Sequence, residues 1–394
     1  MNMAKPTLTE WSVREIPTPA LMEERVSGPQ KYFAKMPYLS CRGVTANTNM
    51  GGARTGQRLT PGSTLEVQFD ADRARLSGFS SSNFKSFVIP EDGIYHVHFQ
   101  ASVWAKNARD IGDNVNAYIN LTGAGADGNI AAVTQQYVRS GWYQTVQVSV
   151  TEFFVSGQRI QPTVYLDSGA TGDWCVADGD VDTGFYAFMI SPNTGGWLER
   201  SPGPAADLIT WADDEYVSVQ TMNEQTVGQL KAKWNPPRIT CRGTTFNMQG
   251  NPPDKNAISW QYMYANDQFE KITIGPGWGS NTGFTIPHDG VYLVSVIGNA
   301  RMMTPPVENS QFAFQVAIYK NFNDKPYVLL QSGNTRKEHE SGLLISDVVR
   351  FAKGDKVNIR FFGYTSTSRW DSGRSDGRWW TMAFTHLGRG TYGT

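Results

Sequence analysis

Apolar and polar residues alternate along several stretches of the chain, which is the period of a β-strand with one buried face. YHVHFQASVWA at 95–105 shows this most clearly, and NVNAYINL at 114–121, TVQVSVTEFFV at 145–155 and QFAFQVAIYK at 311–320 follow the same pattern. Gly and Pro separate such stretches at short intervals. The pattern predicts an all-β protein, with helix confined to the segments that precede the strand-rich regions, best at 222–234 despite its internal glycine.

One punctuation pattern occurs twice. FVIPEDGIYHVHF at 87–99 and FTIPHDGVYLVSV at 284–296 each join an aromatic residue, Ile-Pro and an Asp-Gly turn to a strand that opens with an aliphatic residue and Tyr. The proline cannot donate to a central ladder, so it ends a strand, and Asp-Gly between apolar runs is a turn signal. The chain therefore contains two copies of one structural unit.

The match extends well beyond that motif. TEFFVSGQRIQPTVY at 151–165 aligns with VVRFAKGDKVNIRFF at 348–362, and YLSCRGVTANTNM at 38–50 aligns with RITCRGTTFNM at 238–248. A two-copy repeat of this length is a tandem duplication rather than a solenoid. We expect about eight to ten short strands in each copy, as in a sandwich or jelly roll. The predicted division is an extended N-terminal arm at 1–37, a first domain at 38–192, a linker or second extended arm at 193–237 and a second domain at 238–394.

Composition excludes several classes of protein. Of 394 residues, 40% are hydrophobic and 18% are charged, which suits packed cores, and the net charge of −1 without a basic block argues against nucleic-acid binding. No apolar run is long enough to insert into a membrane or to resemble a signal peptide, so we expect synthesis in a cytosol. The three cysteines, Cys41, Cys175 and Cys241, are odd in number and far apart, which argues against a disulfide framework.

Few residues suggest catalysis or metal binding. His96 and His98 alternate on one strand and face the same side, but the second copy has Leu293 and Ser295 there, so a packed or interface pair is favoured over a metal site. No nucleophile elbow, phosphate loop or H-E-x-x-H motif occurs. We expect no catalytic residue and no cofactor, although a pair of glycosidase carboxylates could still meet in space.

The segment ADGDVDTG contains three carboxylates at alternate positions. Clustered carboxylates suit Ca²⁺, but the segment lacks the glycine and terminal glutamate of an EF-hand loop. A solvated acidic loop is the alternative that we favour. The weak calcium candidates are Asp178, Asp180 and Asp182.

Two Gly-rich loops, GDWCVADGD at 172–180 and SRWDSGRSDGRWW at 368–380, precede the last strand of each copy. A tryptophan ring stacks on apolar faces such as those of sugars, and charged neighbours fix the orientation of the ligand. The alternative is that these rings pack over one end of the sandwich or at a subunit contact. The binding-loop candidates are Trp174, Trp370, Asp371, Arg374, Arg378 and Trp379.

The landmarks resemble those of the C1q-like/TNF-like jelly rolls. That family carries an aromatic residue, Ile/Val-Pro and Gly-x-Tyr before a core strand, then a late Gly-Asp; here Gly354-Asp355 matches, whereas the first copy has Gly157-Gln158. The resemblance implies a homotrimer of jelly rolls that binds rather than catalyses. Tyr95 and Tyr292 are the trimer-interface candidates, with packing in each domain's own core as the alternative.

Tandem jelly rolls behind arms also resemble minor tail or head-decorating proteins of tailed actinobacterial bacteriophages. The resemblance implies a non-enzymatic virion protein, most consistent with a minor tail protein that binds the host surface, with a cell-surface glycan as the candidate ligand. The arms would dock on other virion proteins through Trp11 and Trp211. Head decoration is the first alternative, and a lectin or glycan-processing enzyme the second. The length of the 193–237 segment leads us to expect the two domains to stack as two trimeric layers.

Overall fold

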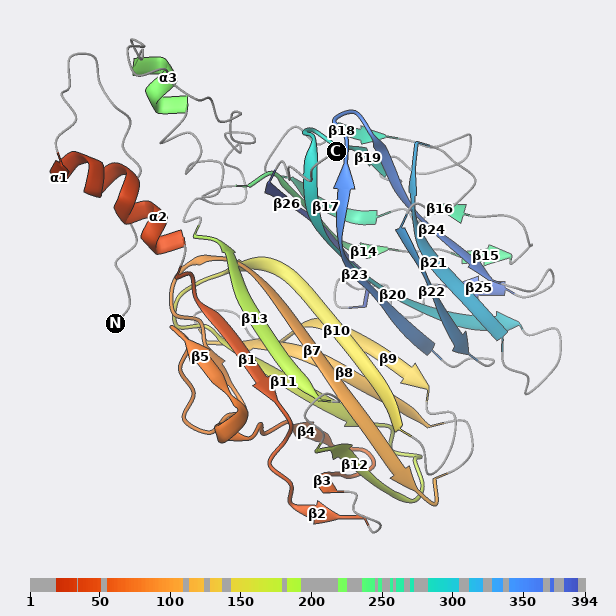
Figure 1. Ribbon diagram of the computed structural model, residues 1–394. Helices are drawn as coiled ribbons and strands as arrows, with labels where there is room; N and C mark the ends of the chain where they lie inside the picture. The colour runs from red at the N-terminus through yellow and green to blue at the C-terminus, as the bar shows by residue number, and fades with distance from the viewer. Residues whose placement is uncertain are drawn as a thin grey trace.

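The fold divides into two β-rich lobes and short helical segments (Figure 1). The computed structural model describes residues 19–33, 35–50, 55–108, 113–123, 128–136, 143–178, 183–192, 219–224, 236–244, 247–249, 256–257, 260–265, 270–272, 283–304, 312–321, 328–335, 340–363, 369–371 and 379–388.

Helix lies in the segments that precede the lobes. The first arm contains α1 (Pro19–Met22), the π-helical turn η1 (Glu23–Ser27) and α2 (Gly28–Phe33), and the second contains α3 (Val219–Asn223). The helical structure at 19–33 differs from the extended arm that was predicted. Leu, Met and two Glu residues favour helix, and Pro suits the first turn. The helix predicted at 222–234 lies mostly outside the described residues. No described helix is long and apolar enough to cross a membrane.

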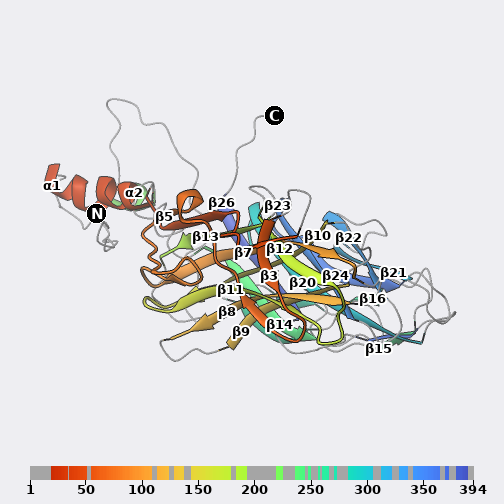
Figure 2. The same ribbon diagram turned by 90° about the horizontal axis from the view of Figure 1, so that it is seen from below.

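The helix α2 packs on the first lobe. Tyr32 is buried, and its hydroxyl donates a 2.6 Å hydrogen bond to Glu91 Oε2 in the turn before the long central strand. Burial, together with that bond to the Glu91 carboxylate, raises the pKa of Tyr32. The remainder of α1 and α2 projects away from the lobe (Figures 1 and 2). Tyr32 thus fixes the end of the arm to the lobe that follows it.

The first lobe is a sandwich of two antiparallel sheets. The sheet that we call its inner sheet has the order β2-β3-β12-β7-β13-β1-β5, with β10 also paired to β7, and the outer sheet has the order β4-β11-β8-β9, with β6 paired to β11. The strands are β1 (Tyr38–Arg42), β2 (Thr48–Asn49), β3 (Thr55–Leu59), β4 (Thr64–Glu66), β5 (Arg75–Ser77), β6 (Phe87–Val88), β7 (Gly93–Lys106), β8 (Asn114–Thr122), β9 (Gly128–Gln136), β10 (Tyr143–Phe154), β11 (Arg159–Leu166), β12 (Asp173–Ala177) and β13 (Gly184–Ser191), with the 3₁₀ turn η2 (Ala71–Arg73).

The second lobe repeats this plan. Its inner sheet has the order β15-β25-β20-β26-β14-β17, with β23 paired to β20, and its outer sheet has the order β18-β19-β24-β21-β22, with β16 paired to β24. The strands are β14 (Arg238–Thr244), β15 (Asn247–Gln249), β16 (Asn256–Ala257), β17 (Trp260–Ala265), β18 (Glu270–Ile272), β19 (Gly283–Thr285), β20 (Gly290–Thr304), β21 (Phe312–Lys320), β22 (Val328–Thr335), β23 (Glu340–Phe351), β24 (Lys356–Gly363), β25 (Arg369–Asp371) and β26 (Thr381–Gly388). The corresponding strand order in the two lobes confirms the predicted all-β, jelly-roll fold.

Each core lies between the two sheets of its lobe. Along β7, alternate residues Tyr95, Val97, Phe99 and Ala101 are fully buried and belong to the first core cluster, as the period of two requires. In the same cluster Phe185, on β13, packs edge to face against Phe99 at 6.2 Å between ring centroids. Alternating apolar residues on the central strands therefore supply much of the apolar material between the sheets.

The turn at which the two copies differ in sequence has the same structure in both. The Gln158 side-chain oxygen accepts from Val155 N at 2.8 Å, and the Asp355 carboxylate accepts from Ala352 N at 2.7 Å. In each turn the preceding glycine has a φ of 85°, which favours glycine. Either side chain closes the turn, because each places an oxygen within hydrogen-bond distance of the same backbone N–H.

Candidate association surfaces

The two lobes meet where an edge of the first lobe packs on the inner sheet of the second. Strands β9 and β10 lie against β20 and β23 (Figure 1). Ser149 Oγ on β10 and Ser295 Oγ on β20 are 2.7 Å apart in a hydrogen bond, and both residues are buried. A buried hydroxyl pair of this kind requires close packing around it, since an unpartnered hydroxyl there would be costly.

Apolar side chains extend each core across this contact. Ile297 and Leu344 of the second lobe belong to the hydrophobic cluster of the first lobe, and Ala132 of the first lobe belongs to that of the second. Tyr118 packs edge to face on Trp379, with 5.8 Å between ring centroids. The contact removes apolar surface from water on both sides and so stabilises the pair of lobes.

The contact joins unlike positions of the repeat. Ser149 lies opposite His98 in the first lobe, and Ser346 lies opposite Ser295 in the second, so Ser149 corresponds to Ser346 and not to its partner Ser295. Such a contact is heterologous: the second inner sheet is covered along β20 and β23, whereas the first inner sheet takes part through its edge strand β10.

The arrangement of the lobes within one chain leaves the stacking of two trimeric layers as a prediction, because stacking is defined along an axis that relates several chains. The lobes lie side by side and touch through an edge and a sheet face (Figure 1). A trimer built on the central face of the second inner sheet would have to displace the first lobe from it. The length of the connecting segment says how far a lobe can reach, and not which surface it prefers.

The first inner sheet carries aromatic side chains on the face that points away from its core. Tyr38 lies opposite Phe188, Phe188 lies opposite His96, and His96 lies opposite Thr151 across four neighbouring strands. Tyr38 is 46% exposed and Phe188 is 41% exposed. We call Tyr38, Phe188 and His96 the aromatic row. Paired exposed aromatic rings on a sheet face are typical of an interaction surface.

The two histidines of this sheet are packed as neutral side chains. His96 Nδ1 is 2.8 Å from Thr151 Oγ1, and its ring lies 5.4 Å from that of Phe188. Burial lowers the pKa of His96 to about 3, with a further contribution from His98, and burial lowers the pKa of His98 to about 4. The packed pair matches the interpretation favoured from the sequence. No cluster of three metal-ligating side chains occurs in the described part of the chain.

The predicted trimer-interface residues lie in the lobe cores. Tyr95 and Tyr292 are both fully buried, and each hydroxyl donates a 2.8 Å hydrogen bond to a backbone oxygen four residues earlier, at Glu91 and His288. Each ring also packs edge to face on a phenylalanine of its own lobe. The interface role is therefore wrong for both, because a side chain enclosed in its own core cannot reach a second chain.

The predicted binding loops do not present the tryptophans that the structure describes. Trp174 is 1% exposed, and its Nε1 donates a 2.8 Å hydrogen bond to Thr171 O, while Trp379 is 2% exposed at the lobe contact. Neither ring can stack on a sugar, which corrects the prediction for these two. The backbone at Trp370 and Asp371 forms β25, and their side chains, like Arg374 and Arg378, lie outside the described part.

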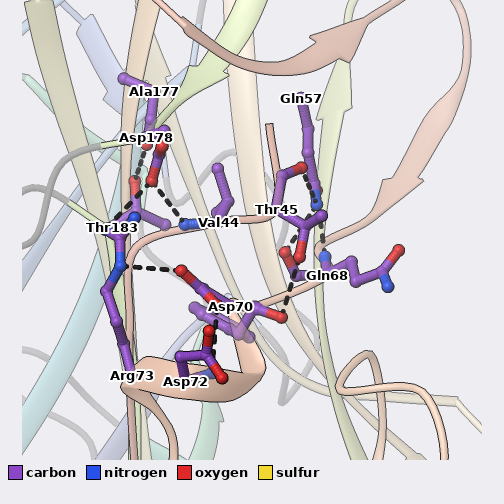
Figure 3. Close-up of polar contacts among 11 residues, drawn as sticks. Val44, Thr45, Gln57, Gln68, Asp70, Asp72, Arg73, Ala177, Asp178 and Thr183 are labelled. Atoms are coloured by element: carbon purple, nitrogen blue, oxygen red, sulfur yellow. Dashed lines mark hydrogen bonds and ion pairs between the residues drawn. The ribbon is translucent and has the colours of Figure 1, made fainter. Parts of the chain in front are cut away.

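Asp178 belongs to a structural network (Figure 3). Its Oδ1 accepts from Val44 N at 3.2 Å and lies 3.3 Å from Arg73 Nη1, and Arg73 Nε is 2.8 Å from Asp70 Oδ2. The carboxylate therefore ties the end of β12 to the turn after β1 and to η2. The arrangement differs from both the calcium site and the solvated loop, because an arginine neutralises the carboxylate. Asp180 and Asp182, and the docking candidates Trp11 and Trp211, lie outside the described residues.

The residues of the two association surfaces were missed in the sequence. Tyr38 and Phe188 stand at comparable positions in the two end strands of the first copy, where the second copy has Arg238 and Thr385. The difference between Tyr38 and Arg238 was visible in the aligned sequences. The Ala-Phe pairs of the two last strands instead match Phe188 with the buried Phe384, and only the strand register sets Phe188 against Thr385. The meaning of these differences was not visible, because alternation says that a residue faces away from the core without saying whether another lobe covers it.

Comparisons with known proteins give little further information. No family model matches the chain, and no curated protein matches it either. Two crystal structures of murine APRIL, at pH 5.0 and pH 8.0, are similar to it at 12% and 13% identity, with TM-scores of 0.29 and 0.27. Each alignment covers 39% of this chain and 99% of the APRIL chain. At such scores the likeness carries no argument, and the jelly-roll assignment rests on the strand order.

Proposed function

We propose that this is a non-enzymatic structural protein that assembles through the open face of its first inner sheet. The observation that carries the proposal is the aromatic row, in which Tyr38 and Phe188 are exposed side by side on a rigid sheet. Aromatic rings contribute large apolar area at low cost in side-chain entropy, which suits a surface that binds protein.

The partner proposed for this face is a second and third copy of the chain. The face continues from the strand that already makes the lobe contact, since β10 carries Ser149 in that contact and Thr151 in line with the aromatic row. Copies that meet around a common axis would extend an existing protein–protein contact rather than need a separate one. The proposed assembly is thus a homotrimer with the first inner sheets towards its axis.

The proposed setting is a tailed-phage virion, as a minor tail protein, with head decoration as the alternative. This part of the proposal rests on the sequence resemblance alone. In that setting the arm at 1–37 docks on another virion protein, and the lobes present loops outward. The burial of Trp174 and Trp379 removes two side chains from the proposed host-glycan site. We therefore propose assembly, rather than glycan binding, as the main function.

The test is the mass of the full chain in solution by light scattering. We expect three chains for the natural protein, and one chain when Tyr38→Glu and Phe188→Glu are combined, because two buried carboxylates would have no partner at the axis. Met22→Glu is the matched control: Met22 is 40% exposed on α1, away from the sheet, so this variant should remain a trimer.

Circular dichroism of the variants checks that the lobes are folded. If the double variant fails to fold, Phe188→Ser replaces it, since serine suits an exposed strand position. A natural protein of one-chain mass, or a trimer that persists in the folded aromatic-row variant, would overturn the proposal.

A further inference from the structure

The second inner sheet accepts the first lobe at a position where a side chain would obstruct it. At Gly342 on β23, an added Cβ would lie 2.6 Å from Val133 Cγ1 and 3.0 Å from the backbone oxygen of Thr134 on β9. The valine methyl could turn aside, but the backbone of an ordered strand cannot. Ile297 and Leu344 complete this acceptor with apolar side chains that join the first lobe's core. The acceptor surface is therefore shaped by the missing side chain at Gly342 and by the apolar side chains of Ile297 and Leu344 beside it.

The corresponding positions of the first inner sheet have the opposite character. The strand register places Gln100 opposite Gln147 in the first lobe, where the second lobe has Ile297 opposite Leu344. Gln147 Nε2 donates a 2.9 Å hydrogen bond to Gln100 Oε1 on the exposed face. Covering these amides with an apolar edge would remove them from water without new partners, which is unfavourable.

The first inner sheet also carries a larger side chain at the position that corresponds to Gly342. Thr145 lies opposite Ser102 in the first lobe, and Gly342 lies opposite Asn299 in the second. Thr145 is exposed and β-branched, so it places two heavy atoms where the docked strand would run. The first sheet therefore opposes an incoming edge both by shape and by polarity.

We propose that these three pairs of positions decide which lobe accepts a partner. Gly342, Ile297 and Leu344 make the second inner sheet an acceptor for the β9–β10 edge. Thr145, Gln100 and Gln147 prevent the same edge from binding the first inner sheet. The partner that is excluded is a second copy of this chain. A heterologous contact that both sheets could accept would join chain to chain without an end, so this difference prevents open filaments. The proposal does not depend on the trimer, which uses a different part of the first sheet.

The first experiment measures the lobe contact inside one full-length chain. Ser149→Cys and Ser295→Cys are introduced together, because the two hydroxyl oxygens that the thiols replace are 2.7 Å apart. After oxidation with diamide we expect an intrachain cross-link, seen as a mobility shift on a non-reducing gel. Adding Gly342→Thr should abolish the cross-link, whereas adding Thr145→Gly, the reverse exchange in the first sheet, should leave it unchanged.

The second experiment transfers the acceptor to the first sheet. Gly342→Thr is combined with Thr145→Gly, Gln100→Ile and Gln147→Leu, so that the released edge of one chain can bind the first sheet of another. We expect the mass by light scattering to rise continuously with protein concentration, which Gly342→Thr alone should not show. The four-residue change thus converts an internal contact into one between chains.

Either of two results would overturn the proposal: a cross-link that survives Gly342→Thr, or a transfer variant whose mass equals that of Gly342→Thr at every concentration. If Gly342→Thr unfolds the second lobe, Ile297→Gln with Leu344→Gln replaces it, since this pair imports the first sheet's own residues. The trimer is tested independently, because a natural protein of one-chain mass would still show the cross-link.

Discussion

The inner sheets of the two lobes have corresponding strands in corresponding order, yet the second is covered along β20 and β23, whereas the first takes part in the contact through its edge strand β10. The second sheet presents Ile297 and Leu344 to the first lobe, and the first sheet presents a hydrogen-bonded glutamine pair at the same register. Where the first sheet has the exposed rings of Tyr38 and Phe188, it has no covering lobe. The two copies share a scaffold and differ in the residues of their outward faces, and the second face is the one that β9 and β10 cover.

The largest expected loss of stability tests whether Tyr95 and Tyr292 have equivalent roles in the two cores. Tyr95→Ala and Tyr292→Ala should each lower the free energy of unfolding by about 3–5 kcal/mol, the usual cost of truncating a buried aromatic ring. Tyr95→Phe and Tyr292→Phe remove only a hydrogen bond to a backbone oxygen, so about 1 kcal/mol is expected for each. Urea unfolding measures both, and a trimer whose mass changes in the folded Phe variants would restore an interface role for these tyrosines.

A smaller loss of stability should distinguish the outward faces of the two inner sheets. Leu344→Ala should cost about 2–4 kcal/mol, because the side chain is buried in the core cluster of the other lobe. Gln147→Ala, at the same register of the exposed first sheet, should change stability by less than about 0.5 kcal/mol. Denaturation midpoints of the two variants give the comparison, and equal losses would show that the first sheet is also covered in solution.

A further effect is confined to acid and tests the two packed histidines of the first sheet. The pKa values of His96 and His98 are about 3 and about 4 in the folded chain, below the ordinary value of about 6.5 for histidine. The unfolded chain therefore binds protons first, so the stability that these neutral rings contribute is complete above pH 6.5 and is lost as the pH falls through 4 towards 3. Replacing them with the second copy's residues, by His96→Leu and His98→Ser, should flatten this dependence.

That histidine prediction is checked by unfolding in urea at a series of pH values between 7 and 3.5. The control is His386→Ala, in the second lobe, which leaves both first-sheet histidines in place. An unchanged pH dependence in the His96→Leu, His98→Ser variant would mean that carboxylates alone cause the acid destabilisation.

Much of the fold could be predicted from local pattern. The alternation at 95–105 gave β7, and the paired Ile-Pro and Asp-Gly turns gave the start of β7 and β20. Gln158 shows the limit of pattern matching: it replaces the expected aspartate, yet accepts the same backbone hydrogen bond as Asp355. The site predictions succeeded less well, because Trp174, Trp379 and both core tyrosines are residue types equally suited to surfaces and cores.

The sequence by itself determined the strands, their turns and the duplication, because these depend on residues close together along the chain and on a period of two. Only the tertiary structure decided which outward face is covered. That choice depends on Gly342 meeting the backbone of β9 and on Ser149 reaching Ser295, contacts between residues far apart in sequence. A glycine in a strand carries no sign of the partner that needs its missing side chain, so the partner had to be seen in place.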